Sequence, residues 1–209
     1  MNRSTVALLT ETWFNKGNKK TAHDLQVLNQ KNGIAVLRKD RTSRGGGIAI
    51  AYDQKIASFK KIPLNTLRGS KFEIMAASGK INGIKKNHIV FVCYLPPSYT
   101  ASENRLFFDV LTDAVSEAHS KFPESWVTIG GDWNNRALDP VLDLFPDLSI
   151  IPSAPTRKDA TLDVVVANYK DHIIAVKVNH PLESEDGSVS DHGVLQIDSI
   201  LPRPRSFTW

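Results

Sequence analysis

An acid and an amide follow a short apolar run in the second half of the chain. WVTI, 126–129, precedes GGDWNN, 130–135, so Asp132 and Asn134 stand at the end of a predicted strand. Side chains at i and i+2 of an extended backbone point to one face, so both groups could act on one ligand. The carboxylate could take a proton from water, and the amide could donate to an anionic oxygen. This pair suits hydrolysis of a phosphate ester, although Asp and Asn beside Gly are also ordinary turn residues.

A histidine near the other end offers acid–base chemistry. SDHG, 190–193, leads into the apolar run VLQI, and the charge of His192 is the easiest to change near neutral pH. Adjacent strand residues face opposite ways, so Asp191 is not expected to orient the ring. Asp163 precedes the apolar run 164–167 and would be costly to bury unpaired. Holding His192 would satisfy it.

A third apolar segment ends in a carboxylate near the start of the chain. VALLTETW, 6–13, places Glu11 after a predicted strand. A lone Glu in this position is more often a solvated turn residue. Because three other strand ends carry polar groups, however, the pattern predicts an open α/β sandwich whose polar residues gather at one rim.

Six segments, in order across nearly the whole chain, resemble the endonuclease/exonuclease/phosphatase superfamily, and within it the apurinic-like endonuclease domain of non-LTR (LINE-type) retrotransposons. They are LLTETW, RGGGIAIAY, VCYLPPS, GGDWNN, PTRKDATLDVVVAN and SDHGVL. The resemblance implies an α/β fold, the two-sheet sandwich of the DNase I type. It also implies a Mg-dependent phosphodiesterase, a DNA endonuclease that nicks target DNA and leaves a 3′ hydroxyl for reverse transcription.

The same resemblance implies a metal site and a means of activating water. Glu11 and Asp191 would bind the cation, and oxygen ligands suit Mg²⁺, with Mn²⁺ as the alternative. Asp132 would activate or position the attacking water, and Asn134 would contact the phosphate.

Further roles carried over from the family concern the transition state and the DNA. The Tyr94 hydroxyl would reach the scissile phosphate or the leaving group. His192, oriented by Asp163, would donate to the phosphoryl oxygens as charge builds. The polar loop ahead of Asp163 supplies candidates for contact with the substrate phosphates: Thr156, Arg157 and Lys158.

The chain departs from the family pattern at its start. These domains usually open with an asparagine-bearing strand and a helix, whereas only ten residues precede Glu11. We therefore expect the first strand and helix to be missing from an otherwise single domain, 1–200, with a Pro-rich tail or linker at 201–209. The alternative to an active endonuclease is a weak or inactive remnant that retains only nucleic-acid binding. A third interpretation is another branch of the superfamily that acts on RNA or phosphoinositides.

Composition and charge favour a soluble protein that binds nucleic acid. The chain is 41% hydrophobic without a long apolar segment, so it can bury a core but is not expected to contact a membrane. The single cysteine, Cys93, and the lack of a signal peptide predict an intracellular and, given the DNA substrate, nuclear location. Residues 1–100 carry 17 Lys and Arg against 5 Asp and Glu, a basic half suited to a phosphate backbone. DNA is the expected partner, with RNA and a reverse transcriptase domain of a longer parent protein as further candidates.

Local patterns predict most of the elements that would hold this rim. Alternating apolar residues predict strands in 34–40, 46–52, 55–61, 71–78 and 88–95, with a hairpin turn at Asn82 and Gly83. Thr100 and Glu103 have the spacing of a capping box ahead of an apolar face with helical periodicity, which predicts a long helix. A shorter helix is expected near 140–145.

Overall fold

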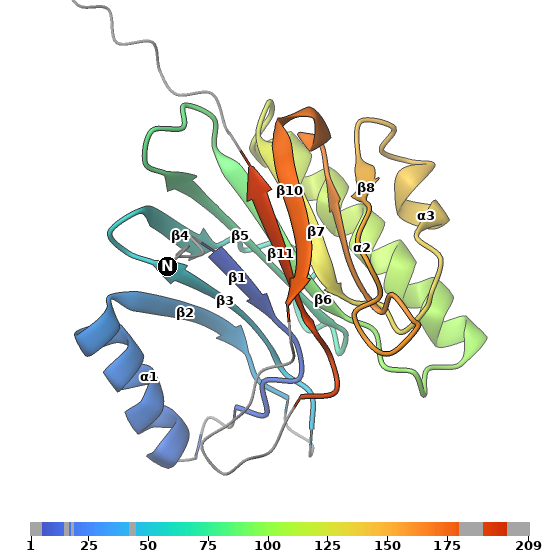
Figure 1. Cartoon of the computed structure of the whole chain (residues 1–209). Helices are drawn as coiled ribbons and strands as arrows, with labels where there is room; N and C mark the ends of the chain where they lie inside the picture. Colours follow the sequence, from blue (N-terminus) through green and yellow to red (C-terminus); the bar gives the residue numbers. More distant parts are fainter. Residues whose placement is uncertain (1–5, 15–16, 18, 42–44, 180–189, 200–209) are drawn as a thin grey trace, which may run out of the picture.

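The computed structural model describes residues 6–14, 17, 19–41, 45–179 and 190–199, and its strands form two layers (Figure 1). One layer is a six-stranded sheet with the order β4-β5-β6-β7-β9-β8. The other contains a three-stranded sheet, β1-β3-β2, and a two-stranded sheet, β10-β11. The predicted tail, 201–209, lies outside the described residues.

The six-stranded sheet carries the middle of the chain. Its strands are β4 (Ala57–Lys61), β5 (Glu73–Ile81), β6 (His88–Tyr94), β7 (Trp126–Asp132), β8 (Ser149–Ile151) and β9 (Asp163–Ala167). The pairs β4–β5, β5–β6, β7–β9 and β8–β9 are antiparallel, whereas β6 and β7 are parallel. A parallel pair needs a crossover connection, which here contains a helix. The strands predicted within 55–61, 71–78 and 88–95 are confirmed, and Asn82 and Gly83 lie in the connection between β5 and β6.

The two smaller sheets hold the ends of the described chain. In the three-stranded sheet, β3 (Ile48–Asp53) lies between β1 (Val6–Leu9) and β2 (Ile34–Lys39), antiparallel to both. The strands β10 (Ile173–Asn179) and β11 (Val194–Ser199) form an antiparallel pair. Within the described residues, β1 pairs with β3 alone and β11 with β10 alone.

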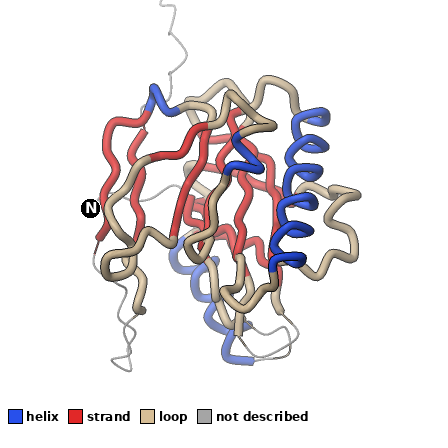
Figure 2. The backbone as a smooth tube through the Cα atoms, turned by 90° about the vertical axis from the view of Figure 1, so that its right-hand side faces the viewer, coloured by secondary structure: helices blue, strands red, loops and turns tan. Residues whose placement is uncertain are grey.

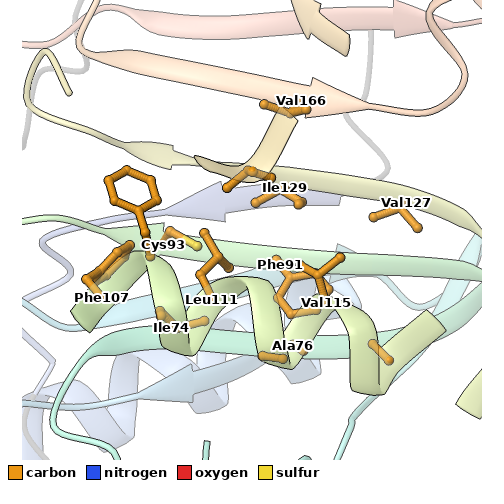
Figure 3. Close-up of a cluster of buried hydrophobic side chains, with 14 of the residues drawn as sticks. Ile74, Ala76, Phe91, Cys93, Phe107, Leu111, Val115, Val127, Ile129 and Val166 are labelled. Atoms are coloured by element: carbon orange, nitrogen blue, oxygen red, sulfur yellow. The ribbon is translucent and has the colours of Figure 1, made fainter. Parts of the chain in front are cut away.

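Apolar side chains fill the space on both faces of the six-stranded sheet. On the face turned toward the three-stranded sheet, Ile48 and Ile50 of β3 pack against β4, β5 and β6. On the outer face, α2 (Ala101–Lys121) lies along the sheet, as Figure 2 shows. Phe107, Leu111 and Val115 of this helix contact the strand residues drawn in Figure 3, with Phe91 and Ile129 at the centre of the cluster.

The long helix begins where the sequence predicted it. The Thr100 hydroxyl accepts a hydrogen bond from the Glu103 backbone N–H, and the Glu103 carboxylate accepts one from the Thr100 N–H, so the capping box is confirmed. The other helices are α1 (Lys19–Asn32), α3 (Asp139–Leu142) and a short 3₁₀ turn, Lys170–His172. In the described part of the chain, none of the helices is both long and apolar enough to cross a membrane.

Candidate active site

Three neighbouring strands of the six-stranded sheet end in polar residues at the same edge. In the strand register, Tyr94 at the end of β6 is opposite Asp132 at the end of β7, and Asp132 is opposite Asp163 at the start of β9. Parallel β6 and β7 finish together, and antiparallel β9 starts where β7 finishes. The register therefore places the three polar side chains in a row across the sheet.

Two glycines let β7 approach its neighbours so closely that this row can form. A Cβ on Gly131 would stand 1.8 Å from the carbonyl oxygen of Cys93 in β6, and the Gly131 φ of 154° disfavours a side chain in any case. A Cβ on Gly130 would lie 2.6 Å from the Leu8 side chain of β1, so this position faces the three-stranded sheet. Asp132, two residues later on the same strand, faces the same way. The GG of GGDWNN thus directs the carboxylate into the space between the two layers.

A tight turn after β7 holds Asp132. The Asn134 N–H donates to Asp132 Oδ1 at 2.9 Å, and Asn134 has a left-handed φ of 46°. The Asn134 amide nitrogen donates to the carbonyl oxygen of Leu95 at 3.0 Å and to Asp132 Oδ2 at 3.1 Å. The expectation that an extended backbone aligns the two side chains is wrong, because β7 ends at Asp132 and an Asx turn brings Asn134 back onto it. The phosphate contact of Asn134 stays a prediction, since both amide hydrogens have protein acceptors.

The tryptophan of the same motif anchors this turn in the core. Trp133 is 1% exposed, and its ring stacks on Phe108 of α2 with centroids 6.2 Å apart. Its indole N–H donates to the carbonyl oxygen of Val164 in β9 at 3.0 Å. Burial of Trp133 on one face of the sheet therefore fixes the direction of Asp132 on the other face.

His192 and Asp163 form the pair that the sequence suggested. His192 Nδ1 lies 2.8 Å from Asp163 Oδ2, and both side chains are about one-fifth exposed, at 22% and 21%. Among the described residues Nε2 has no partner closer than Asp191 Oδ1, which is 3.9 Å away. With Nδ1 held by a carboxylate, Nε2 is the nitrogen presented to a ligand.

A buried threonine connects the two segments that carry this pair. The Thr156 hydroxyl accepts hydrogen bonds from the backbone N–H groups of Leu162 and Asp163, both at 3.1 Å. Its carbonyl oxygen accepts the Gly193 N–H at 2.6 Å. Thr156 is 3% exposed, so in this structure it supports the site from below the surface. Its predicted contact with substrate stays untested.

Tyr94 and Glu11 close the opposite side of the row. The Tyr94 hydroxyl donates to Glu11 Oε1. Glu11 is exposed and has a left-handed φ of 47°, in the turn that follows β1. Burial and the bond to Glu11 both raise the pKa of Tyr94 above its usual value, so its hydroxyl keeps its proton.

Asp132 is the carboxylate most affected by its surroundings. Its pKa is raised to about 6, chiefly by burial and also by the nearby charges of Asp163 and Glu11, while the Asn134 N–H and His192 oppose the rise. A carboxyl with a pKa in this range is mostly ionised at neutral pH and still accepts a proton readily. Such a shift in a polar rim is typical of a catalytic group, although structural clusters also produce it.

The donor set fits a hard divalent cation. Among the described residues, ligand atoms of Asp132, Asp163 and His192 lie within 4.8 Å of one another. Glu11 adds to the negative charge felt by Asp132. A cation would relieve the repulsion among these carboxylates, and carboxylate oxygens are the ligands preferred by Mg²⁺ and Mn²⁺.

The other predicted metal ligand, Asp191, does not belong to this group, although its Oδ1 lies 3.9 Å from His192 Nε2. Asp191 is 66% exposed at its side chain and pairs with Arg157, whose Nη2 is 2.5 Å from Asp191 Oδ2. Asp191, Thr156 and Lys158 line a hollow beside the His192 loop, together with Asn179 of β10. Arg157 and Lys158 are exposed, so both are accessible to a substrate.

Glu73 supports the site next to Glu11, and the sequence analysis did not predict this role. Glu73, at the start of β5 and 4% exposed, accepts the Gly47 N–H at 2.5 Å and lies 3.4 Å from Arg41 Nε. The three glycines, Gly45 to Gly47, are thereby fixed to the six-stranded sheet. In the sequence, the acidic Glu73 near the start of the otherwise apolar segment KFEIMAAS could have indicated this support.

Comparison with solved structures shows the fold. The 3′ phosphatase NExo from Neisseria, bound to a product DNA hairpin, matches with a TM-score of 0.68 and 14% identity over 95% of this chain and 90% of that chain. A mannosyl-6-phosphatase from Bacteroides thetaiotaomicron matches with a TM-score of 0.65 and 11% identity, over 94% and 85% of the two chains. For a truncated TDP2 from Caenorhabditis elegans the TM-score is 0.64 and the identity 14%, over 91% and 82%.

No protein-family model and no curated protein matches the sequence. The structural matches show that the chain has the DNase I-like, endonuclease/exonuclease/phosphatase fold. At these identities the likeness concerns the fold, so the chemistry of this chain must be argued from its own side chains.

Proposed function

We propose that this protein is a metal-dependent phosphodiesterase that hydrolyses DNA. The observation that carries the proposal is the convergence of Asp132, Asp163 and His192 within 4.8 Å at one edge of the sandwich. Tyr94 of the neighbouring strand β6 extends this row, and Glu11, from the turn after β1, is bonded to it. A base, an oriented imidazole and a cation-binding set of carboxylates are the parts that in-line hydrolysis of a phosphodiester requires.

Each group has a role that follows from its position. Asp132, with its pKa near 6, accepts the proton of the attacking water. Asp163 holds His192 through Nδ1, and His192 Nε2 would face a phosphoryl oxygen, where negative charge builds. The Tyr94 hydroxyl, which keeps its proton, donates to the phosphate or to the leaving oxygen.

Glu11 would hold the cation, as the sequence resemblance implies, and the charges of Asp132 and Asp163 would attract it to the site. A bound Mg²⁺ or Mn²⁺ would neutralise charge on the phosphate and lower the pKa of its water. Asp191 would join Glu11 only if its ion pair with Arg157 opened.

DNA is the favoured substrate for two reasons. A protein of the same fold, NExo, is described as bound to a product DNA hairpin. The first half of this chain also carries an excess of 12 basic residues, which suits a polyanion. More specifically, we propose an endonuclease of the retrotransposon type, which nicks DNA and leaves a 3′ hydroxyl for a reverse transcriptase. The resemblance of the six sequence segments supports this finer proposal.

The test is cleavage of a supercoiled plasmid with Mg²⁺, with Mn²⁺ and with EDTA. The wild-type chain should nick with either metal and lose activity in EDTA. Asp132→Asn and His192→Ala should each reduce the rate by about 100-fold to 1000-fold. Asp113→Asn removes an equivalent carboxylate from the exposed surface of α2 and should leave the rate unchanged.

Two outcomes would decide against the proposal. Binding of DNA without cleavage in either metal would favour the inactive remnant. Cleavage that persists in Asp132→Asn would show that the assigned site is wrong. Extension of the nicked strand by a DNA polymerase tests the 3′ hydroxyl, because a 3′ phosphate blocks extension.

A further inference from the structure

A large aromatic ring stands in solvent at the rim of the candidate active site. Trp13 is 58% exposed, whereas the other tryptophans among the described residues, Trp126 and Trp133, are 7% and 1% exposed. Trp13 follows Glu11 by two residues, and Glu11 bonds Tyr94 at the end of β6. The indole therefore belongs to the turn that carries one of the site carboxylates.

The backbone under this ring is fixed. The Trp13 N–H donates to the carbonyl oxygen of Gly46 at 2.9 Å, and the Thr12 N–H donates to that of Gly47 at 3.1 Å. Trp13 also adopts a left-handed φ of 52°, which is uncommon for a bulky residue. Single exposed apolar residues are common and need no explanation. Trp13 is different, because its left-handed backbone lies beside a polar site and is held by the hydrogen bonds of the Thr12 and Trp13 N–H groups. The surrounding structure must therefore enforce its conformation.

The glycine turn that holds Trp13 is anchored in turn by charged groups. Glu73 accepts the Gly47 N–H, and Arg41 pairs with Glu73. A Cβ on Gly45 would lie 3.6 Å from the Trp13 ring, so the indole packs over backbone there and leaves its other surface open. The rim thus combines a rigid aromatic surface with a neighbouring guanidinium.

A ligand that fits this rim has a flat apolar face and a negative charge beside it. An unpaired nucleobase joined to its phosphate has both. Stacking of a base on a rigid aromatic ring is the usual way in which proteins hold unpaired nucleotides, with cationic side chains along the phosphates. A base inside an intact duplex does not offer its face.

We propose that Trp13 is a stacking platform for an unpaired nucleobase of the strand whose phosphate occupies the Asp132–His192 site. The inference rests on the proposed function and narrows its substrate to strands with an unpaired base close to the scissile phosphate. Arg41 supports the adjoining phosphate. Trp13 acts in binding and takes no part in bond cleavage.

The test compares binding of three DNA ligands in EDTA, where cleavage does not intervene: a paired duplex, the same duplex with one unpaired base, and the single strand. Trp13→Ala should weaken binding of the last two by about 5-fold to 150-fold and leave the paired duplex within about twofold. Trp13→Phe should keep most of the affinity. Leu144→Ala removes another exposed apolar side chain, 64% exposed and beyond α3, and should change nothing. RNA versions of the ligands tell whether the sugar matters.

The outcomes separate this inference from the proposed function. Equal binding by Trp13→Ala and wild type, or equal loss on paired and unpaired DNA, overturns the stacking role even if the plasmid is nicked. If the wild type cleaves no plasmid but Trp13→Ala loses affinity only for unpaired DNA, the stacking role stands and catalysis fails. Failure of the wild type to bind any of the ligands removes both. Thermal melting of each variant confirms that the loss is local.

Discussion

A buried threonine at the candidate site is bonded to both segments that carry the Asp163–His192 pair. Thr156 is buried, and its hydroxyl holds the backbone at Leu162 and Asp163 while its carbonyl holds Gly193. Asp163 and His192 come from segments far apart in the sequence, and their 2.8 Å contact requires both to be placed accurately. Thr156 is therefore a positioning residue that acts through this pair.

Replacing Thr156 by Val keeps the shape and removes the hydroxyl. Two backbone N–H groups then lose their acceptor, which should lower the free energy of unfolding by about 1 to 3 kcal/mol. We also expect kcat for DNA hydrolysis to fall about tenfold or more with little change in KM, because a misplaced His192 affects the transition state more than binding. Thermal melting and steady-state kinetics measure the two effects. Thr156→Ser retains the hydroxyl and should restore kcat, so a Ser variant no better than Val would contradict the positioning role.

Sequence reasoning identified site residues best where a strand end determines their position. Asp132, Asp163 and Tyr94 follow or precede apolar runs, and the sheet register brings them together. Asp191 and Thr156 lie in loops, where the partner of a side chain depends on tertiary contacts that no local pattern encodes. The ion pair of Asp191 with Arg157 is an example, since nothing in SDHG or PTRKDAT predicts it.

Helices and strands were predicted correctly where the local sequence pattern was strong. The capping box and apolar face made α2 recognisable, and alternating residues did the same for β2 to β6. The helix α1 was missed because it is mostly polar and has no acidic residue in its first turn, and Thr21 is its buried residue. The three-residue strand β8 is too short to have a period, and only its pairing with β9 defines it.

A buried histidine at the contact between β6 and β7 should make the stability of the protein depend on pH. His88, at the start of β6, bonds the Thr128 hydroxyl through Nε2 at 2.9 Å, and Thr128 bonds the Tyr169 hydroxyl at 2.7 Å. The His88 Nδ1 is buried and has no hydrogen-bond partner in the described part of the chain, and the ring contacts Phe59 and Tyr169. Burial lowers the pKa of His88 to about 4 from its ordinary value of 6.5, because the charged form is poorly solvated there.

His88 should therefore make the protein less stable in acid. Between pH 6.5 and 4 the unfolded chain binds a proton that the folded chain refuses, so the free energy of unfolding falls as the pH drops through this range. A shift of this size corresponds to a loss on the order of 2 to 3 kcal/mol between pH 7 and pH 4. Urea denaturation of the wild type and of His88→Gln at several pH values measures it. The variant should lose less stability in acid, whereas His23→Gln, on the exposed surface of α1, should follow the wild type. Parallel curves for wild type and His88→Gln would exclude His88 as the cause.

Over the whole molecule, charge is divided unequally along the chain. The first half holds 17 of the 26 Lys and Arg residues and forms the front three-stranded sheet and β4 to β6. The carboxylates Asp132 and Asp163 of the candidate site come from the second half. The six-stranded sheet brings the two halves together at the site edge, because Tyr94 at the end of β6 is opposite both Glu73 of β5 and Asp132 of β7. Lys71, two residues before β5, is therefore at the site end, whereas Lys85, in the connection between β5 and β6, is at the opposite end.

This division predicts a salt dependence that distinguishes the two ends of the molecule. Each phosphate contact releases counterions, so the logarithm of DNA affinity should fall linearly with the logarithm of salt concentration. Lys71→Gln should weaken binding at all sequences and reduce the slope by about one, because it removes one contact near the scissile phosphate. Lys85→Gln removes the same charge from the far end and should leave the slope unchanged. Fluorescence anisotropy with a labelled duplex between low and physiological salt measures both. Equal slopes for the two variants would mean that DNA does not lie along the site edge, and a wild-type affinity independent of salt would mean that the basic half does not bind the DNA backbone.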